Sequence, residues 1–169
     1  IREYHVDGFR FDATHSFFLN HRLLHRAAHE IRDKGIKPDA IMIAENLPNE
    51  ADLNLQGYNG FAQWCNLFHD KLKAILREGR YEAQDNSPQG LGSAFYFAKD
   101  QFAAHTNNVI NYIESHDENS VQFEVATSGP RLQDQWVKNR KARLGLMATM
   151  TALGQPMIYM GQEFGVERE

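Results

Sequence analysis

The sequence has a single cysteine, no long apolar run and no cluster of basic residues, so nothing in it indicates a disulfide-bonded, membrane or nucleic-acid-binding protein. It contains one cysteine, Cys65, in 169 residues, so no disulfide can form within the chain and a disulfide-stabilised secreted fold gains no support. No apolar run approaches the ~20 residues that span a bilayer. The 18 basic residues are scattered and outnumbered by 22 acidic ones, which gives a net charge of −4. We therefore expect neither a nucleic acid nor a membrane as partner, and a neutral or polar small molecule as substrate.

The composition that is present is that of one ordinary globular domain. Hydrophobic residues make up 42% of the chain and charged residues 24%. Cys65 is interpreted as a small core residue. The chain begins at Ile1, almost inside an expected strand, so we interpret it as a piece of a longer protein.

Expected strands and helices alternate along the chain. Short apolar or β-branched runs predict strands at 5–13, 39–46, 60–64, 108–115 and 157–161. Helical spacing of apolar residues predicts helices at 17–34, 67–78 and 134–153, with a polar loop at 116–133. This alternation predicts an α/β fold with a parallel sheet covered by helices. No glycine-rich phosphate loop follows a strand, which disfavours a dinucleotide-binding fold.

Two details of these helices are also predicted. Asn66 is a candidate N-cap for the helix at 67–78. The helix at 134–153 is expected to pack through an apolar face made of Trp136, Val137, Leu144, Met147 and Met150.

Three expected strands end in acidic residues, namely Asp12, Glu45 and Asp117. In a parallel α/β barrel the carboxyl ends of the strands converge on one face, which is where active sites lie. Alternation along "VDGFRFDATH" puts Arg10 and Asp12 on one face of the strand, and there Arg10 favours the ionised form of Asp12. For this strand alone, a purely architectural Arg–Asp pair is the alternative.

Four stretches in order resemble the signature regions of the α-amylase family of retaining glycoside hydrolases and transglycosidases. They are "DGFRFDATH", "IMIAEN", "NYIESHDEN" and, at the eighth barrel strand, "GQPMIYMGQEFG". The resemblance covers nearly the whole chain. It implies a (β/α)₈ barrel (TIM barrel), of which residues 1–169 hold the C-terminal half, roughly strands four to eight.

The resemblance also implies roles for individual residues. Asp12 matches the catalytic nucleophile, and Arg10 matches the arginine beside it. Glu45 matches the general acid/base, and the apolar residues before it are expected to favour its protonated form. Asp117 matches the aspartate that stabilises the transition state, and His116 a substrate-binding histidine.

Other polar and aromatic residues have two interpretations each. His15 could line a leaving-group subsite or be a histidine at a helix entry without a catalytic role. Tyr58, Phe61 and Trp64 could form a sugar-stacking platform, although core packing is the commoner arrangement. The spacing of His21, His25 and His29 predicts a solvated helix face rather than a metal site.

The resemblance leaves the particular activity open. It implies an α-glucan or maltooligosaccharide substrate and a covalent glycosyl-Asp intermediate, with hydrolysis or branching transglycosylation of α-1,4-glucans as the outcome. "SHDE" and "GQEFG" resemble branching enzymes, whereas residues 60–76 and His15 resemble maltooligosyltrehalose trehalohydrolases, the alternative activity. A non-catalytic amylase-like binding module is a further alternative.

Cofactor and location are predicted only coarsely. No cofactor is expected, and a structural calcium ion is compatible with the resemblance, but the sequence has no cluster of oxygen ligands that places it. A cytoplasmic location is expected, and the oligomeric state is not predicted.

Overall fold

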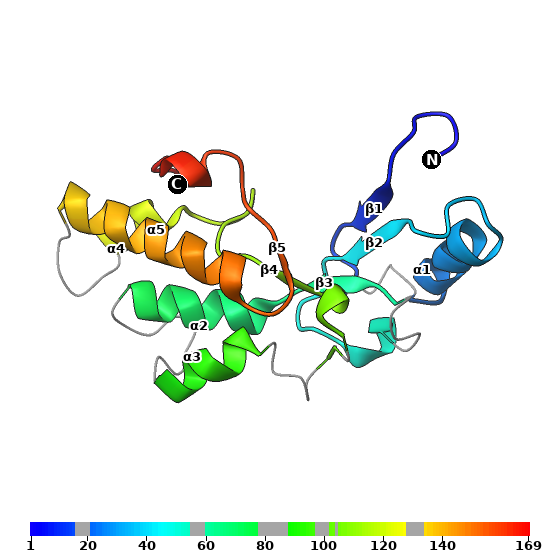
Figure 1. Ribbon diagram of the computed structural model, residues 1–169, viewed down its shortest axis with the longest axis horizontal. Helices are drawn as coiled ribbons and strands as arrows, with labels where there is room; N and C mark the ends of the chain where they lie inside the picture. The colour runs from blue at the N-terminus through cyan, green and yellow to red at the C-terminus, as the bar shows by residue number, and fades with distance from the viewer. Residues whose placement is uncertain (16–20, 55–59, 78–87, 97–101, 104, 128–133) are drawn as a thin grey trace. The chain divides into compact units, whose positions relative to one another are not determined.

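The structure is a computed structural model, and it describes residues 1–15, 21–54, 60–77, 88–96, 102–103, 105–127 and 134–169 (Figure 1). The chain divides into two compact units. The first is Ile1–Trp64 with Lys99–Val109, and the second is Cys65–Ala98 with Ile110–Glu169. No helix among the described residues is long and apolar enough to cross a membrane.

Strands and helices occur in the predicted order, with two further helices, at Pro88–Phe95 and Val121–Thr127, that the sequence did not predict. The strands are β1 (Gly8–Phe11), β2 (Ile41–Ala44), β3 (Ala62–Trp64), β4 (Val109–Asn111) and β5 (Gln155–Pro156). The α-helices are α1 (His21–Ala28), α2 (Asn66–Leu76), α3 (Pro88–Phe95), α4 (Val121–Thr127) and α5 (Gln135–Thr151). Both units are α/β in content, which confirms the predicted class.

The first unit is built on three parallel strands in chain order, β1, β2 and β3. Phe11 of β1 pairs with Ala44 of β2, so the two strands end level with each other. The chain between them forms α1 and a π-helical turn, His29–Asp33, and then reverses at Gly35, whose φ of 75° suits glycine. The core of this unit consists of Leu24, Ala28, Ala40, Met42, Ala44, Leu53 and Phe61.

The second unit contains the parallel pair of β4 and β5, in which Ile110 pairs with Gln155. Its longest helix, α5, packs against α2 and α4 (Figure 1). Gly145 allows this close approach, because a Cβ atom there would lie 2.6 Å from Ile113 Cδ1 and 3.0 Å from Leu76 Cδ1.

The predicted apolar face of α5 is wrong. Trp136, Leu144, Met147 and Met150 are 53% to 65% exposed, and the buried residues of the helix are Ala142, Gly145, Ala148 and Thr149. Small side chains let the helix axis approach its neighbours, so packing selects the small face rather than the most hydrophobic one.

Element boundaries differ from the predictions in several further places. Strand β4 ends at Asn111, short of the predicted 108–115, so the expectation that Asp117 lies just beyond a strand end is wrong. The expected loop at 116–133 contains helix α4, and the last strand lies at Gln155–Pro156 rather than at 157–161. Cys65, not Asn66, occupies the N-cap position of α2, and Asn66 is the first helical residue. The predicted helix at 17–34 is confirmed from His21 onward as α1 and the π-turn; residues 16–20 lie outside the described residues.

Candidate active site

The level ends of β1 and β2 bring two of the predicted carboxylates together. Asp12 and Glu45 each follow the last residue of their strand. The ladder continues past the strands: the Glu45 amide donates to the Phe11 carbonyl at 3.0 Å, and the Thr14 amide donates to the Glu45 carbonyl at 2.9 Å. The backbone thus fixes both acidic residues at the carboxyl edge of the parallel strands.

One arginine bridges these two carboxylates. Arg10 Nη1 lies 2.7 Å from Asp12 Oδ1, and Arg10 Nη2 donates to Glu45 Oε2 at 2.6 Å. The guanidinium also lies over the Trp64 ring, 4.7 Å from its centre, in a cation–π contact. We call Arg10, Asp12 and Glu45 the Arg10 cluster. Since the two nitrogens share one carbon atom, the two carboxylates lie side by side.

Glu45 does not have the apolar surroundings that its sequence neighbours suggest. Its side chain is 13% exposed, and Oε2 accepts hydrogen bonds from Arg10 and from the Ala13 amide at 3.2 Å. The preceding apolar residues are neighbours along the strand, whereas the Glu45 side chain contacts Arg10 and the Ala13 amide at the adjacent strand end.

Sequence reasoning missed two buried polar residues under the Arg10 cluster. The Thr14 hydroxyl lies 3.0 Å from the Glu45 carbonyl and 2.8 Å from Asn46 Oδ1, and both side chains are fully buried. Asn46 Nδ2 in turn donates to the Pro48 carbonyl at 2.9 Å. These bonds fix the chain after each carboxylate. Their only signal in the sequence is position, one or two residues beyond an acidic strand end.

Two more of the predicted site residues, His116 and Asp117, lie in the second unit and pair with each other. His116 Nε2 is 3.0 Å from Asp117 Oδ2, and the two side chains are 51% and 62% exposed. The Asp117 amide donates to Ser115 Oγ at 3.2 Å, and Arg168 donates to the Ser115 carbonyl at 2.7 Å. The loop that carries them is therefore held by its backbone.

A buried lysine of the same unit binds the chain that follows His116 and Asp117. Lys73 of α2 is 1% exposed, and its Nζ donates to the Asn119 carbonyl at 2.8 Å and to Glu124 Oε1 of α4 at 2.6 Å. Glu118 Oε2 lies 3.9 Å from the same nitrogen and 3.5 Å from His69 Nε2. We call Lys73, Glu124, Glu118 and His69 the Lys73 cluster. The long-range partners explain why the sequence alone did not reveal it.

Burial shifts several ionisation equilibria in this unit. Burial lowers the pKa of His69, but its hydrogen bonds to Asp70 and Glu118 outweigh this and leave the pKa above the ordinary value. Burial raises the pKa of Glu114, whose carboxylate accepts from the Val121 amide at the start of α4. Burial also raises the pKa of the Cys65 thiol to about 11, which fits the predicted core role rather than a reactive one.

The remaining predicted residues differ in their exposure to solvent. His15 is exposed in the turn after Thr14. Phe61 and Trp64 are 1% and 5% exposed, so they pack in the core instead of presenting a stacking platform. Tyr58 lies outside the described residues.

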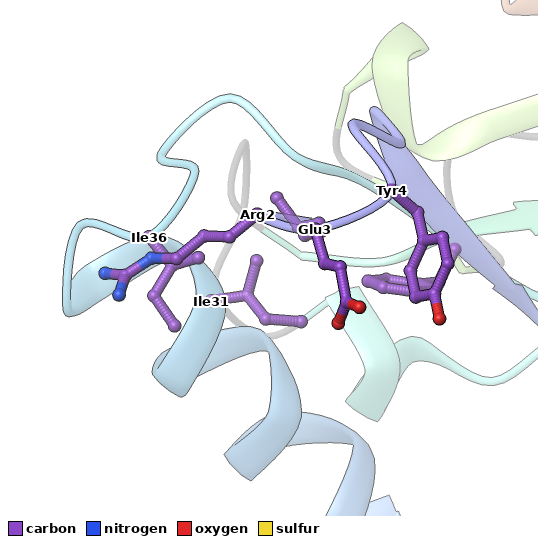
Figure 2. A pocket seen from close by; sticks show the side chains of 7 residues that line it. Arg2, Glu3, Tyr4, Ile31 and Ile36 are labelled. Carbon is purple, nitrogen blue, oxygen red and sulfur yellow. The ribbon is translucent and has the colours of Figure 1, made fainter.

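A hollow of about 390 Å³ lies away from these polar groups, by the segment that precedes β1 (Figure 2). It is lined by Ile1, Arg2, Glu3, Tyr4, Phe9, Ile31 and Ile36. Asp12 and Glu45 follow the opposite ends of their strands, and neither lines it. We therefore assign the candidate site to the strand ends and not to this hollow.

The described residues contain one group with metal-ligand chemistry, His21, Glu50 and Asp52. Calcium takes oxygen ligands, and the imidazole nitrogen makes this group a poor fit for the calcium ion that the resemblance allows.

Parallel strands with acidic side chains at their carboxyl ends define the class as an α/β protein with a carboxylate site. Comparisons with known proteins go further. Over 99% of its length the chain is 30% identical to the malto-oligosyltrehalose trehalohydrolase of Saccharolobus solfataricus. Over 97% it is 27% identical to the pullulanase of Bacillus subtilis. No family model matches the sequence.

Solved structures share the fold. The pullulanase of Anoxybacillus sp. LM18-11, crystallised with maltotriose, superposes on 98% of the chain with a TM-score of 0.78 at 21% identity, and the match covers 25% of that structure. The apo pullulanase of Klebsiella pneumoniae superposes on 97% of the chain with a TM-score of 0.74 at 15% identity, and the match covers 23% of that structure.

These findings confirm the resemblance stated from the sequence. The homologues of this chain are malto-oligosyltrehalose trehalohydrolases and pullulanases, which are glycoside hydrolases of the α-amylase family. The chain spans 32% of the length of the Saccharolobus relative and 25% of that of the Bacillus relative.

Proposed function

We propose that this chain is the C-terminal half of an α-amylase-type catalytic (β/α)₈ barrel, in a protein that hydrolyses α-glucosidic bonds in α-glucans or maltooligosaccharides by a retaining mechanism. The observation that carries the proposal is the Arg10 cluster. It pairs two carboxylates side by side at adjacent strand ends, and a retaining glycosidase needs two carboxyl groups about 5 Å apart. The homology to trehalohydrolases and pullulanases supports the substrate class.

The proposed reaction has two steps. In the first, Asp12 Oδ attacks the anomeric carbon, the glycosidic C–O bond breaks, and the departing oxygen takes a proton from Glu45. In the second, Glu45 takes a proton from water, and the water oxygen attacks the anomeric carbon and releases Asp12. Glu45 thus enters the first step as a carboxylic acid and enters the second step as a carboxylate.

Three further residues complete the proposal by resemblance. Asp117 and His116 would bind sugar hydroxyls and favour the distorted ring of the transition state, and His15 would contact the leaving-group side. Their exposed, polar side chains are available for such contacts.

The test is a pair of matched substitutions in the full-length protein. Asp12→Asn removes the nucleophile, whereas Asp7→Asn removes an exposed carboxylate near the start of the same strand, which pairs with Lys37. With amylose as substrate, reducing ends should rise for wild type and Asp7→Asn, and the rate for Asp12→Asn should fall by on the order of 10⁴-fold or more. Equal activity of Asp12→Asn and wild type would rule out Asp12 as nucleophile.

A second substitution distinguishes the role of Glu45 from that of Asp12. Glu45→Gln should abolish cleavage of natural glucans but retain the first step on a glucosyl fluoride, because fluoride leaves without a proton. If Glu45→Gln were equally impaired on both substrates, Glu45 would not be the acid.

The second candidate activity is that of a malto-oligosyltrehalose trehalohydrolase, which the 30% identity to that enzyme favours. Release of trehalose from maltooligosyltrehalose, faster than release of reducing ends from amylose, would select it. A fall in iodine staining of amylose without new reducing ends would select branching transglycosylation instead. No turnover of any of these substrates would favour a non-catalytic binding module.

A further inference from the structure

His21, Glu50 and Asp52 come together in the first unit from two separate segments. His21 is the first residue of α1, and Asp52 lies in the 3₁₀ turn Ala51–Asn54, which follows the chain that leaves β2. His21 Nδ1 is 2.6 Å from Asp52 Oδ2 and 3.7 Å from Glu50 Oε2. One ligand atom from each residue lies within 4.8 Å of the others.

The hydrogen bond made by His21 Nε2 determines whether Nδ1 has a lone pair that can bind a metal ion. His21 Nε2 is 3.2 Å from the Thr14 carbonyl, which only accepts hydrogen bonds, so Nε2 carries a hydrogen and donates it. In the neutral ring Nδ1 is then a bare lone pair that faces two carboxylates. Histidines that bind metals have this same arrangement, with one nitrogen donating to a carbonyl and the other directed at the ion.

The second carboxylate oxygen of Asp52 also favours a bound cation. Asp52 Oδ1 is a buried oxygen that has no hydrogen-bond partner among the described residues. Oδ1 is not the oxygen that contacts His21, which is Oδ2, so an ion would remove the cost of this unpaired acceptor by binding the carboxylate through both oxygens. The group as a whole carries two carboxylates for one imidazole.

We infer that His21, Glu50 and Asp52 bind a divalent transition-metal ion of the Zn²⁺ type. One imidazole and two carboxylates suit a borderline ion such as Zn²⁺, whereas Ca²⁺ and Mg²⁺ take oxygen ligands. Around a tetrahedral zinc ion with bonds of about 2.1 Å, ligand atoms lie about 3.4 Å apart. The Glu50 oxygen already lies close to that separation from His21, and the Asp52 oxygen must move outward by less than 1 Å.

The ion would have a structural role. It would join the start of α1 to the turn after β2, and through the Thr14 carbonyl and amide it would reach the backbone of Glu45. It would thereby hold the two chain segments that follow Asp12 and Glu45. The rival explanation is an ion pair bridged by a proton on Nδ1. Burial lowers the pKa of His21, but the Asp52 hydrogen bond and charge leave it raised, so that form is available without an ion.

The chain offers a matched control. His29 Nδ1 lies 2.7 Å from Asp33 Oδ2, within 0.1 Å of the His21–Asp52 distance of 2.6 Å, but it is an i,i+4 pair with one carboxylate and more exposed side chains. His29→Gln therefore removes a histidine–aspartate contact without touching the proposed ligand group. Asp52→Asn keeps the shape of the side chain and removes its charge.

The experiment measures zinc binding without substrate, so its result does not depend on the proposed glycosidase activity. The full-length protein is treated with EDTA, moved to chelator-free buffer and titrated with ZnCl₂ by calorimetry, and thermal unfolding is followed with and without zinc. Wild type and His29→Gln should bind with the same affinity and unfold at a higher temperature with zinc. His21→Gln and Asp52→Asn should bind at least about tenfold more weakly and lose the zinc-dependent rise.

Cobalt gives a spectroscopic check on coordination. Co²⁺ should produce the same visible absorption band in wild type and His29→Gln, and the band should be absent in His21→Gln. Circular dichroism in EDTA shows whether each variant folds; if His21→Gln does not, Asp52→Asn provides the comparison. Absence of saturable zinc binding to wild type, or binding that His21→Gln and Asp52→Asn retain in full, would overturn the inference and leave a proton-bridged ion pair.

Discussion

The two units each contain a cation held between acidic groups, but they place it differently with respect to solvent. In the Arg10 cluster, the arginine side chain is 29% exposed and Asp12 is 73% exposed. In the Lys73 cluster, the lysine is 1% exposed and Glu124 is 7% exposed. The carboxylate partners of Arg10 belong to the proposed catalytic pair, whereas Lys73 donates one of its hydrogen bonds to the backbone carbonyl of Asn119.

This difference separates a charge cluster suited to chemistry from one suited to architecture. A solvent-facing pair can exchange its partners at little cost, because water compensates for broken contacts. A buried pair cannot, since removing one partner leaves the other charge without water or a counter-ion. We therefore expect substitutions in the Arg10 cluster to change activity and substitutions in the Lys73 cluster to change stability.

The largest effect on stability is expected for Lys73→Met. This change leaves Glu124 buried without its closest cation and the Asn119 carbonyl without its donor, which should lower the free energy of unfolding by about 3–5 kcal/mol. Urea unfolding measures it. Lys71→Met, on the same helix but less buried, is the control and should stay within about 0.5 kcal/mol of wild type.

A double substitution sharpens this prediction. Lys73→Met combined with Glu124→Leu removes both charges, so most of the lost stability should return. If Lys73→Met alone were neutral, Lys73 would not be buried as the structure shows.

Arg10→Lys should have the next largest effect, and on activity instead. Lysine is a point charge that cannot bridge two carboxylates as the planar guanidinium does. Asp12 and Glu45 would then lose their common anchor, and a misplacement of about 1 Å can reduce kcat/KM by about 100-fold. Steady-state kinetics on amylose measures the rate, and Arg26→Lys on the exposed face of α1 is the control.

The contrast predicts little change in the stability of the Arg10→Lys variant. Because Arg10 and Asp12 are partly exposed and the substituted lysine keeps the positive charge, the thermal unfolding temperature of the variant should stay close to that of wild type. Unfolding at a clearly lower temperature with an unchanged rate would mean that Arg10 is architectural after all.

The sequence predicted the Arg10 cluster far better than the Lys73 cluster, and the reason is physical. Arg10 lies on β1 and Asp12 directly follows it, so alternation along extended chain predicts the face they share, and Glu45 directly follows the next strand. Parallel pairing then makes their meeting a local consequence of register. The family resemblance pointed to the same residues.

Lys73 and Glu124 are 51 residues apart, on helices whose packing one sequence does not reveal. The same limit explains the errors in α4 and α5. Residues 121–127 looked like loop because Gln122 and Glu124 are polar, although both are buried in the fold. The preference of α5 for its small-residue face depends on how closely α2 approaches Gly145, which is a property of tertiary structure.

Gly145→Ala tests how closely α5 packs against its neighbours in the second unit. The added methyl group would meet Ile113 and Leu76, and overpacking of this kind lowers stability by about 1–3 kcal/mol. Gly92→Ala on α3 is the matched control: nothing lies within 4 Å of its Cβ position, so it should stabilise the protein by about 0.5–1 kcal/mol. Denaturant unfolding of both variants measures the difference, and the same sign for both would contradict the close approach of α5.

The smallest expected effect is the pH dependence that His69 contributes to the Lys73 cluster. Its folded-state pKa is raised above the ordinary 6.5 by Asp70 and Glu118, against the opposing effect of burial, so the folded protein binds this proton more tightly than the unfolded chain does. The resulting stability is fully present below about pH 6.5 and is lost as the pH rises through the raised pKa.

His69→Gln should therefore narrow the difference in the free energy of unfolding between mildly acidic and alkaline buffer. Free energies of unfolding measured between about pH 5.5 and pH 8.5 for both proteins test this, because any loss of packing shifts the variant equally at every pH. Asp70→Asn removes a carboxylate that raises the pKa and should weaken the pH dependence in the same direction. A gap between wild type and His69→Gln that stays constant with pH would mean that the His69 proton does not stabilise the cluster, which would then depend on Lys73 and Glu124 alone.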